Sequence, residues 1–381
     1  MFALYVHWPF CLKKCPYCDF NSHVKQSIDH TQWRDALLRE LDHYGRETKG
    51  RALTSVFFGG GTPSLMEADT VASILDKAGE YWQMADDVEV TLEANPTSTE
   101  AKRFQDFKQA GINRLSIGVQ SFDDDVLAYL GREHSAAEAT KAIGVANKTF
   151  ERTSFDLIYA TPDQTRDHWK AQMKQALDLA GDHLSVYQLT IESGTAFHRA
   201  GKVALNSDRA ADMFDDTQSV LADVGLPAYE ISNHAKDGQE CRHNLVYWQG
   251  GDYVGIGPGA HGRLRLDAQT FATQTVATHQ IHNPDIWLKA VEEKGEGTAK
   301  RRPLDIESRA EELLILGLRL TQGIDLPAIQ KRTGIWLLDH INADQRQLLT
   351  NAGFLKPSKT HLIATPVGLM RLNSVIEKLV G

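Results

Sequence analysis

Short apolar runs rich in β-branched and aromatic residues recur along the first half of the chain. Runs of this length and composition are typical of buried strands in a parallel sheet. Polar or glycine residues follow each run, where they would mark the carboxyl end of the strand. Six runs are predicted as strands, at residues 3–8, 53–61, 88–96, 114–122, 154–162 and 184–192.

The residues between these runs follow a helical period. Trp33, Leu37 and Leu41, for example, are spaced to lie on one face of a helix. Strands that alternate with helices indicate βαβ units and a parallel sheet. Six repeats predict an α/β fold with a (β/α)6 partial barrel rather than an open sheet, and chemistry then belongs at the carboxyl ends of the strands. Further helical patterns occupy residues 67–80, 98–110, 136–149, 165–180 and 208–224.

The pattern changes at residues 290–303, where the charged, glycine-containing stretch AVEEKGEGTAKRRP is typical of a linker. Helical stretches, a short hairpin and a last helix follow, which predicts a helical, winged-helix-like module. This module lacks the basic recognition helix of DNA-binding winged helices, so a packing or lid role is favoured. The predicted domains are a core part-barrel at 1–235, an extension at 236–295 and a C-terminal module at 300–381.

Composition narrows the class of protein. The 381 residues are 42% hydrophobic and 24% charged, as in a soluble globular protein, and carry a net charge of −9. This charge argues against a nucleic-acid-binding protein, which needs a basic face. No run reaches the roughly 18 apolar residues of a membrane span, and the N-terminus lacks the positively charged start of a signal peptide. We therefore expect a cytoplasmic protein without a membrane span, and leave peripheral membrane contact open.

Three of the four cysteines, Cys11, Cys15 and Cys18, lie close together, whereas Cys241 lies far downstream. Their C-x3-C-x2-C spacing, in a loop after the first predicted strand, allows them to converge on one metal centre. A structural zinc site needs four ligands, and the nearby set has three. Thiolates also suit iron–sulfur clusters, in which three cysteines leave one iron open to a small molecule. We therefore predict a cluster, with three unligated cysteines as the alternative.

This motif, followed by an aromatic residue and a (β/α)6 part-barrel, resembles that of the radical S-adenosylmethionine enzymes. The resemblance implies a 4Fe–4S cluster on Cys11, Cys15 and Cys18, whose open iron binds S-adenosylmethionine. The stretch GGGTP at 59–63 strengthens it, because glycines let the backbone approach a ligand closely.

Further motifs resemble the coproporphyrinogen dehydrogenase branch of these enzymes and, within it, the HemW group. They are YVHWPFC, CPYCDFNSH, FFGGGTPS, LEANP, RLSIGVQSF, LGREH, FDLIYATP and LSVYQLTIE. The resemblance assigns contacts with cluster-bound S-adenosylmethionine to Tyr5, Gly60 and Glu93. For the charged residues in these motifs, surface salt bridges and helix caps are equal alternatives when each is taken alone. A second S-adenosylmethionine position is assigned to Gly61, Thr62, Gln120, Arg132 and Asp156.

Two features separate the HemW group from the dehydrogenases. The dehydrogenases carry a further cysteine where this chain has Phe20, and they have an extension before the first strand, which begins here at about Phe2. Resemblance to the HemW group implies a heme chaperone that delivers heme to acceptor proteins, and it leaves enzymatic activity open. The alternative is an oxygen-independent coproporphyrinogen III dehydrogenase, which carries out oxidative decarboxylation.

The stretch CRHNLVYW at 241–248 contains the group's H-N-x-x-Y-W motif. The resemblance makes His243 the candidate axial ligand of heme iron, and Tyr247 and Trp248 offer rings to a porphyrin. Without the resemblance, a structural histidine is the favoured interpretation of His243. Cys241 is most simply a buried small hydrophobe, with a thioether bond to heme as the alternative.

The stretch GIGPGA at 255–260 fits a dinucleotide-binding pattern formally. Such a site also needs a preceding strand, a helix that opens at the glycines and an acidic residue about twenty positions on. The preceding stretch is short and Pro258 interrupts the loop. We interpret GIGPGA as a tight loop near the cofactor sites, with His261 facing the same cavity.

Overall fold

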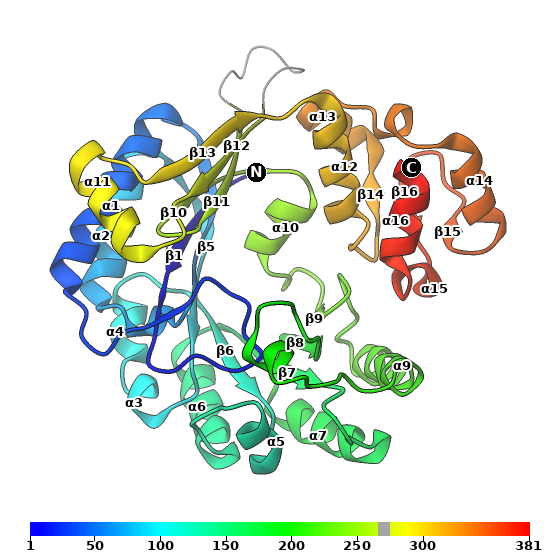
Figure 1. Ribbon diagram of the computed structural model, residues 1–381, viewed down its shortest axis with the longest axis horizontal. Coiled ribbons are helices and arrows are strands. Elements are labelled where there is room, and N and C mark those ends of the chain that lie inside the picture. Colours follow the sequence, from blue (N-terminus) through cyan, green and yellow to red (C-terminus); the bar gives the residue numbers. More distant parts are fainter. Residues whose placement is uncertain (266–274) are drawn as a thin grey trace.

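The computed structural model describes residues 1–265 and 275–381. Its main element is an 11-stranded sheet with the order β13-β12-β11-β10-β1-β4-β5-β6-β7-β8-β9 (Figure 1). Six neighbouring strands run parallel and overlap the six predicted strands, so the predicted (β/α)6 partial barrel is confirmed. They are β1 (Phe2–Trp8), β4 (Ala52–Gly60), β5 (Gln83–Ala94), β6 (Arg114–Gln120), β7 (Arg152–Tyr159) and β8 (His183–Gln188).

Helices cover the outer side of this part-barrel (Figure 1). The helix α1 (His30–Glu47) buries Trp33, Leu37 and Leu41, and Asp29 caps its start by accepting a hydrogen bond from the Gln32 backbone. The other helices along this part of the chain are α2 (Ala68–Tyr81), α3 (Ser98–Ala101), α4 (Phe104–Gln109), α5 (Asp124–Tyr129), α6 (Ala136–Thr149), α7 (Arg166–Leu179), α8 (Ala196–Arg199) and α9 (Ser207–Asp223).

Shorter elements complete the barrel. Two-residue strands β2 and β3 pair within the cysteine loop, and β9 closes the far edge of the sheet against β8. A 3-10 helix η1 follows β4 directly. Their bounds are β2 (Phe10–Cys11), β3 (His23–Val24), η1 (Pro63–Leu65) and β9 (Asn233–Ala235).

The other edge of the sheet continues beyond β1. The strand β10 (Asp252–Ile256) pairs with β1 in parallel. Antiparallel strands β11 (His261–Arg265), β12 (Thr275–Gln280) and β13 (Thr298–Pro303) follow, and α11 (Pro284–Lys294) connects the last two. Residues 266–274, inside the predicted extension at 236–295, lie outside the described residues.

The prediction of a linker at 290–303 is wrong, because these residues form the end of α11 and the strand β13. Five of the six β13 residues are exposed, since β13 is an edge strand with one neighbour. Charged residues on an edge strand discourage pairing with a further chain, and they give the strand the composition of a linker. The domain boundaries drawn around this stretch stay predictions.

The C-terminal region has a helical, winged-helix-like arrangement with its own apolar core, which includes Leu313, Leu337 and Leu379. Three short strands in the order β14-β16-β15 form its sheet. The elements are α12 (Ile306–Gly317), β14 (Ile324–Asp325), α13 (Leu326–Thr333), η2 (Leu337–His340), α14 (Ala343–Asn351), β15 (Leu355–Lys356), β16 (His361–Ala364), α15 (Pro366–Leu369) and α16 (Leu372–Val380).

The helix α10 (Arg242–Trp248) lies between the barrel strands and the C-terminal helices (Figure 1). It contacts β1, β4 and β10 on one side and α12 on the other. The H-N-x-x-Y-W motif therefore sits on a helix that fills the open side of the part-barrel. Among the described residues, none of the helices is both long and apolar enough to span a membrane.

Candidate functional site

The three clustered cysteines lie in the loop that leaves β1 at its carboxyl end. Cys11 is buried in β2, whereas Cys15 and Cys18 are partly exposed. Two of the sulfurs have a polar neighbour from another part of the barrel. Thr62 Oγ1 donates to Cys11 Sγ at 3.5 Å, and Arg132 Nη1 donates to Cys15 Sγ at 3.3 Å. A cation and a hydroxyl beside the sulfurs favour thiolates, which are the form that binds metal.

Burial raises the pKa of the Cys11 thiol, the hydrogen bond from Thr62 lowers it, and the negative charges of Cys18 and Cys15 raise it again. The Cys11 sulfur is thus within electrostatic reach of the other two cysteines, and a cationic centre at this loop would favour the thiolate form. Within the described ranges, no three His, Cys, Asp or Glu side chains form a ready single-ion site. Three thiolates from one loop are the kind of donor set that an iron–sulfur cluster takes, and this assignment stays a prediction.

The end of β4 packs directly against the cysteine loop. Gly60 has φ +115°, and a side chain there would collide with His7 and with the carbonyl oxygen of Trp8. A side chain on Gly61 would meet the backbone of Phe10. The Thr62 backbone N–H donates to the Phe10 carbonyl at 2.8 Å, which continues this contact. The glycines of GGGTP therefore allow the strand end to lie beside Cys11.

Asn95 connects Thr62 with Arg132. Its Nδ2 donates to Thr62 Oγ1 at 3.2 Å, and its Oδ1 accepts from Arg132 Nη2 at 2.7 Å. Arg132 Nη2 also donates to the Gly118 carbonyl at 2.8 Å. Asn95 was not predicted as a site residue, although its place in LEANP, directly after a strand end, is a signal for one. Asn95 holds Arg132 in the direction of Cys15.

Two partly buried carboxylates, Glu93 of β5 and Asp156 of β7, lie near each other, and Glu93 also lies near Tyr5. Burial raises the pKa of Glu93 to about 8, with a further contribution from the negative charge of Asp156. Burial likewise raises the pKa of Asp156 to about 6. The Gly60 N–H donates to Glu93 Oε2 at 3.3 Å. Ionisation of these two carboxyl groups is unfavourable in the cofactor-free protein, and a cationic ligand would offset that cost. S-adenosylmethionine carries two such groups, an ammonium and a sulfonium.

A cavity of about 880 Å3 opens beside these residues. Tyr5, Gly60 and Glu93, which were assigned to the cluster-bound S-adenosylmethionine, all line it. The residues assigned to a second position, Gly61, Thr62, Gln120, Arg132 and Asp156, are outside this lining. The rest of the lining comes from His7 of β1, the cysteine loop (Phe20 and Asn21), α10, the strands β10, β11 and β13, the connections beside them, and α12.

Gln120 ends β6 with φ 71°, a left-handed conformation that is unfavourable for a residue with a side chain. Its amide nitrogen lies about 3.0 Å from where a side chain on Gly118 would begin. The left-handed backbone at Gln120 therefore turns its side chain back toward Gly118 of the same strand. Arg132 also contacts Gly118, through the Gly118 carbonyl oxygen.

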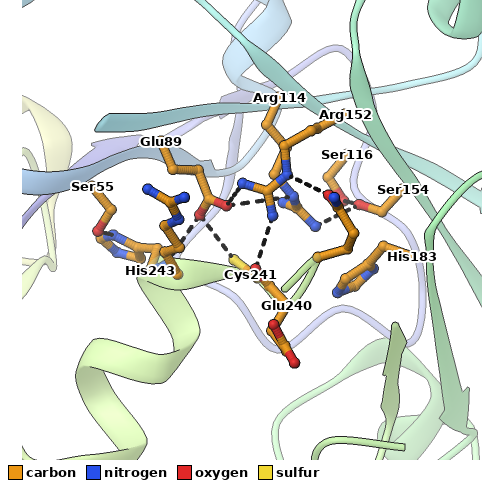
Figure 2. Close-up of polar contacts among 12 residues, drawn as sticks. Ser55, Glu89, Arg114, Ser116, Arg152, Ser154, His183, Glu240, Cys241 and His243 are labelled. Atoms are coloured by element: carbon orange, nitrogen blue, oxygen red, sulfur yellow. Dashed lines mark hydrogen bonds and ion pairs between the residues drawn. The ribbon is translucent and has the colours of Figure 1, made fainter. Parts of the chain in front are cut away.

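The start of α10 is anchored to the opposite, N-terminal ends of the barrel strands. Figure 2 shows Glu89 of β5 facing both Arg152 and the first turn of α10. Glu89 Oε2 lies 2.7 Å from Arg152 Nη1 and 3.9 Å from Arg114 Nε. Glu89 Oε1 accepts from the His243 backbone N–H at 3.2 Å and from Cys241 Sγ at 3.6 Å. Cys241 is buried, and burial raises its pKa to about 12, so it stays a thiol.

His243 is buried, and both of its ring nitrogens are hydrogen-bonded. Nδ1 lies 3.1 Å from Ser55 Oγ, and Nε2 lies 2.6 Å from the Tyr247 hydroxyl. The ring stacks on Phe57 with centroids 5.0 Å apart. Burial lowers the pKa of His243 to about 3, with a smaller contribution from Arg114. Ligation of heme by His243 would require loss of one of these hydrogen bonds, and the assignment stays a prediction.

The substitution Glu93→Gln should stabilise the cofactor-free protein at alkaline pH. The folded protein holds the Glu93 pKa near 8, above its ordinary value of 4.5, so wild-type stability falls as pH rises from about 4.5 through 8. The amide side chain of the Glu93→Gln variant stays neutral throughout. The apparent Tm of this variant should therefore exceed that of the wild type by a few degrees at pH 8.5 but equal it at pH 4.5.

Thermal melts across this pH range check the effect, with Glu80→Gln at an exposed position as the control. The same Glu93 variant should bind S-adenosylmethionine more weakly. Identical melting temperatures for the Glu93 variant and the wild type at both pH values would show that ionisation of Glu93 does not destabilise the folded protein.

Comparison with known proteins matches this chain to two family models. They are the radical SAM superfamily over residues 5–176 and the HemN C-terminal domain over residues 304–371. The heme chaperone HemW of Escherichia coli (strain K12) is 36% identical over 377 residues, which cover 98% of this chain and 97% of that protein. The mitochondrial radical S-adenosyl methionine domain-containing protein 1 of Danio rerio is 40% identical over 327 residues, 84% of this chain and 73% of that protein.

A solved structure has the same architecture along the whole chain. Coproporphyrinogen III oxidase (HemN) from Escherichia coli, a radical SAM enzyme, matches with a TM-score of 0.83 over 100% of this chain and 90% of that one. The two sequences are 22% identical, and at this level the likeness shows a shared fold.

Proposed function

Because the chain belongs to the HemW heme chaperones of the radical SAM superfamily, we propose that it binds heme and delivers it to acceptor proteins. The family implies a 4Fe–4S cluster and S-adenosylmethionine as cofactors. Heme as cargo, a cytoplasmic location and acceptor proteins as partners belong to the proposal.

The observation that carries this proposal is the cavity of about 880 Å3 between the barrel and α12. It has the size of a cofactor site, and aromatic and aliphatic residues supply much of its lining. Tyr247, Trp248 and Tyr253 come from α10 and β10, and Leu304 and Leu316 come from the C-terminal side. A flat, largely apolar ring with charged groups at its edge fits such a surface, because the same lining also holds Arg263, Arg302 and Glu311.

The cofactor assignments follow from the contacts around the cysteine loop. We place the cluster on Cys11, Cys15 and Cys18, beside Arg132. When bound, such a cluster in this superfamily supplies an electron to S-adenosylmethionine. The protein's own contribution is to hold that molecule's cationic groups near Glu93 and to keep water away from it.

Tyr5 supports the same placement. Its hydroxyl lies 3.0 Å from His7 Nδ1, and His7 Nε2 lies 2.9 Å from the Asn21 carbonyl, so a partly buried chain of hydrogen bonds joins β1 to the cysteine loop. Burial raises the pKa of Tyr5 well above its ordinary range, with the charge of Glu93 as a further cause. Tyr5 is therefore a neutral phenol, positioned as a hydrogen-bond donor or acceptor at the cavity.

Two assays on the anaerobically reconstituted protein test the proposal. Titration with hemin should show saturable binding with a Soret band, and the loaded protein should transfer heme to an apo-hemoprotein. With a reductant and S-adenosylmethionine, coproporphyrinogen III should not be converted to protoporphyrinogen IX, because Phe20 replaces the further cysteine of the dehydrogenases. Phe20 is exposed and lines the cavity.

The two assays separate the chaperone from the alternative enzyme. Robust turnover of coproporphyrinogen III with release of methionine would establish the dehydrogenase instead. Hemin binding without transfer to any apo-hemoprotein would contradict the delivery step alone.

A further inference from the structure

His261 is the first residue of β11, and its side chain is exposed on the lining of the cavity. Among the described residues, no hydrogen-bond partner of its ring is found. The strands that carry it and the helix α12 stand on opposite sides of α10 (Figure 1). The His261 imidazole is therefore presented toward a space that α12 bounds from the other side.

Neighbouring histidines fix the plane of the His261 ring. It stacks on His279 of β12 with centroids 4.1 Å apart and an angle of 24° between the planes. The ring of His282 meets His279 edge-on at 4.5 Å. The pKa of His261 lies below its ordinary value, because the ring is partly desolvated beside the neighbouring rings and because the charges of His279 and Arg263 lie nearby. The neutral form of such an imidazole is the form that ligates iron.

The other sides of the cavity suit the two faces and the edge of a porphyrin. Phe20 and Ile315 line it with exposed fractions of 62% and 43%, so two large apolar side chains face open space. Trp248 of α10 lines the same cavity. Apolar groups left exposed around a cavity commonly mark a binding surface, because a ligand that covers them gains the hydrophobic free energy.

Charge in the cavity indicates where heme propionates would lie. Arg263 is committed to Glu312 at 2.7 Å, whereas Arg302 of β13 lines the cavity without an ion-pair partner among the described residues. A guanidinium binds a carboxylate through two parallel hydrogen bonds. Glu311 also lines the cavity and would repel a propionate. The propionates would therefore lie at the edge of the cavity next to Arg302.

His243 is placed differently. It lies behind Tyr247, packed between Phe57 and Tyr5, with both nitrogens already bonded. Its hydrogen bond to the Tyr247 hydroxyl fixes a residue that does line the cavity. We therefore infer that His261 supplies the axial nitrogen to heme iron, that Arg302 pairs with a propionate, and that His243 is a positioning residue. This inference rests on the proposed heme-binding function.

Hemin titration of the full-length protein tests the assignment by the Soret band and the electron paramagnetic resonance spectrum. His261→Ala should weaken hemin binding by about tenfold or more, as expected for loss of a coordinate bond, and should shift the Soret band. Excess free imidazole should restore the wild-type spectrum of this variant, because imidazole refills the vacated ligand position. A residue with a merely structural role would show no such rescue.

Two further variants serve as comparisons. His243→Phe keeps the ring packing on Phe57 but loses the bond to Tyr247, so its affinity should fall while the Soret position stays and imidazole changes nothing. Arg302→Ala should weaken hemin binding less than His261→Ala and leave the ligand-dependent spectrum intact. A wild-type spectrum in His261→Ala, or imidazole rescue in His243→Phe or His282→Ala instead, would overturn the assignment. Failure of the wild-type protein to bind hemin would overturn the proposed function itself.

Discussion

Alanine at Cys11, Cys15 or Cys18 should leave the reconstituted protein without bound iron and without the visible absorbance of a cluster. Each residue supplies one of three thiolates from a single loop, and a cluster held by two thiolates loses both a bond and charge neutralisation. The loss should be complete for each variant, because the fourth cysteine of the chain lies too far from this loop to replace the missing ligand. Iron and sulfide determinations after anaerobic reconstitution measure it.

Cys241→Ala is the matched control for this experiment. Cys241 contacts Glu89 in the N-terminal part of the barrel, whereas the cysteine loop follows the carboxyl end of β1. Its iron content should equal that of the wild type. Iron loss in the Cys241 variant, or retention of a full cluster in any of the other three, would show that the ligand set is wrong.

The barrel could be predicted from the sequence because its strands are buried on both faces. Leu4, Val56 and Leu92, for example, are fully buried in β1, β4 and β5, and such strands give continuous apolar runs. The edge strand β13 has no apolar run, since its residues face solvent. Its role depends on pairing with β12, and pairing between strands separated by a helix leaves no local pattern in the sequence.

The candidate site was predictable only in part. The spacing of the cysteines and the glycines of GGGTP indicate a ligand site without knowledge of the fold. The setting of His243 was not predictable, because Ser55, Phe57 and Tyr247 come from β4 and α10 and meet only in the folded protein. The contacts of Asn95 were not predictable for the same reason, since its partners Thr62 and Arg132 follow other strands, although its position after a strand end was a local signal.

Glu89→Ala should destabilise the protein more than any surface substitution. The Glu89 side chain is fully buried, and the Arg114 side chain beside it is 3% exposed. Removal of this carboxylate leaves two guanidinium groups, those of Arg114 and Arg152, without their buried anion. Breaking a buried ion pair from one side typically costs about 3–5 kcal/mol in the free energy of unfolding. Urea denaturation followed by circular dichroism measures this loss.

Glu80→Ala provides the matched control, because Glu80 pairs with Lys77 at 2.9 Å but is 60% exposed. An exposed pair of this kind contributes about 0–1 kcal/mol. Equal urea midpoints for the two variants would contradict a structural role for the Glu89 network.

Glu89 should also affect heme binding through α10. It accepts hydrogen bonds from both Cys241 and His243, and these bonds fix the first turn of the helix whose other end presents Tyr247 and Trp248 to the cavity. The Glu89→Ala variant should therefore bind hemin more weakly, at a temperature where it is still folded, while its iron–sulfur content stays near the wild-type value. Because the cysteine loop lies at the opposite ends of the strands, a parallel loss of the cluster would mean that the whole barrel, and not α10 alone, depends on this buried charge.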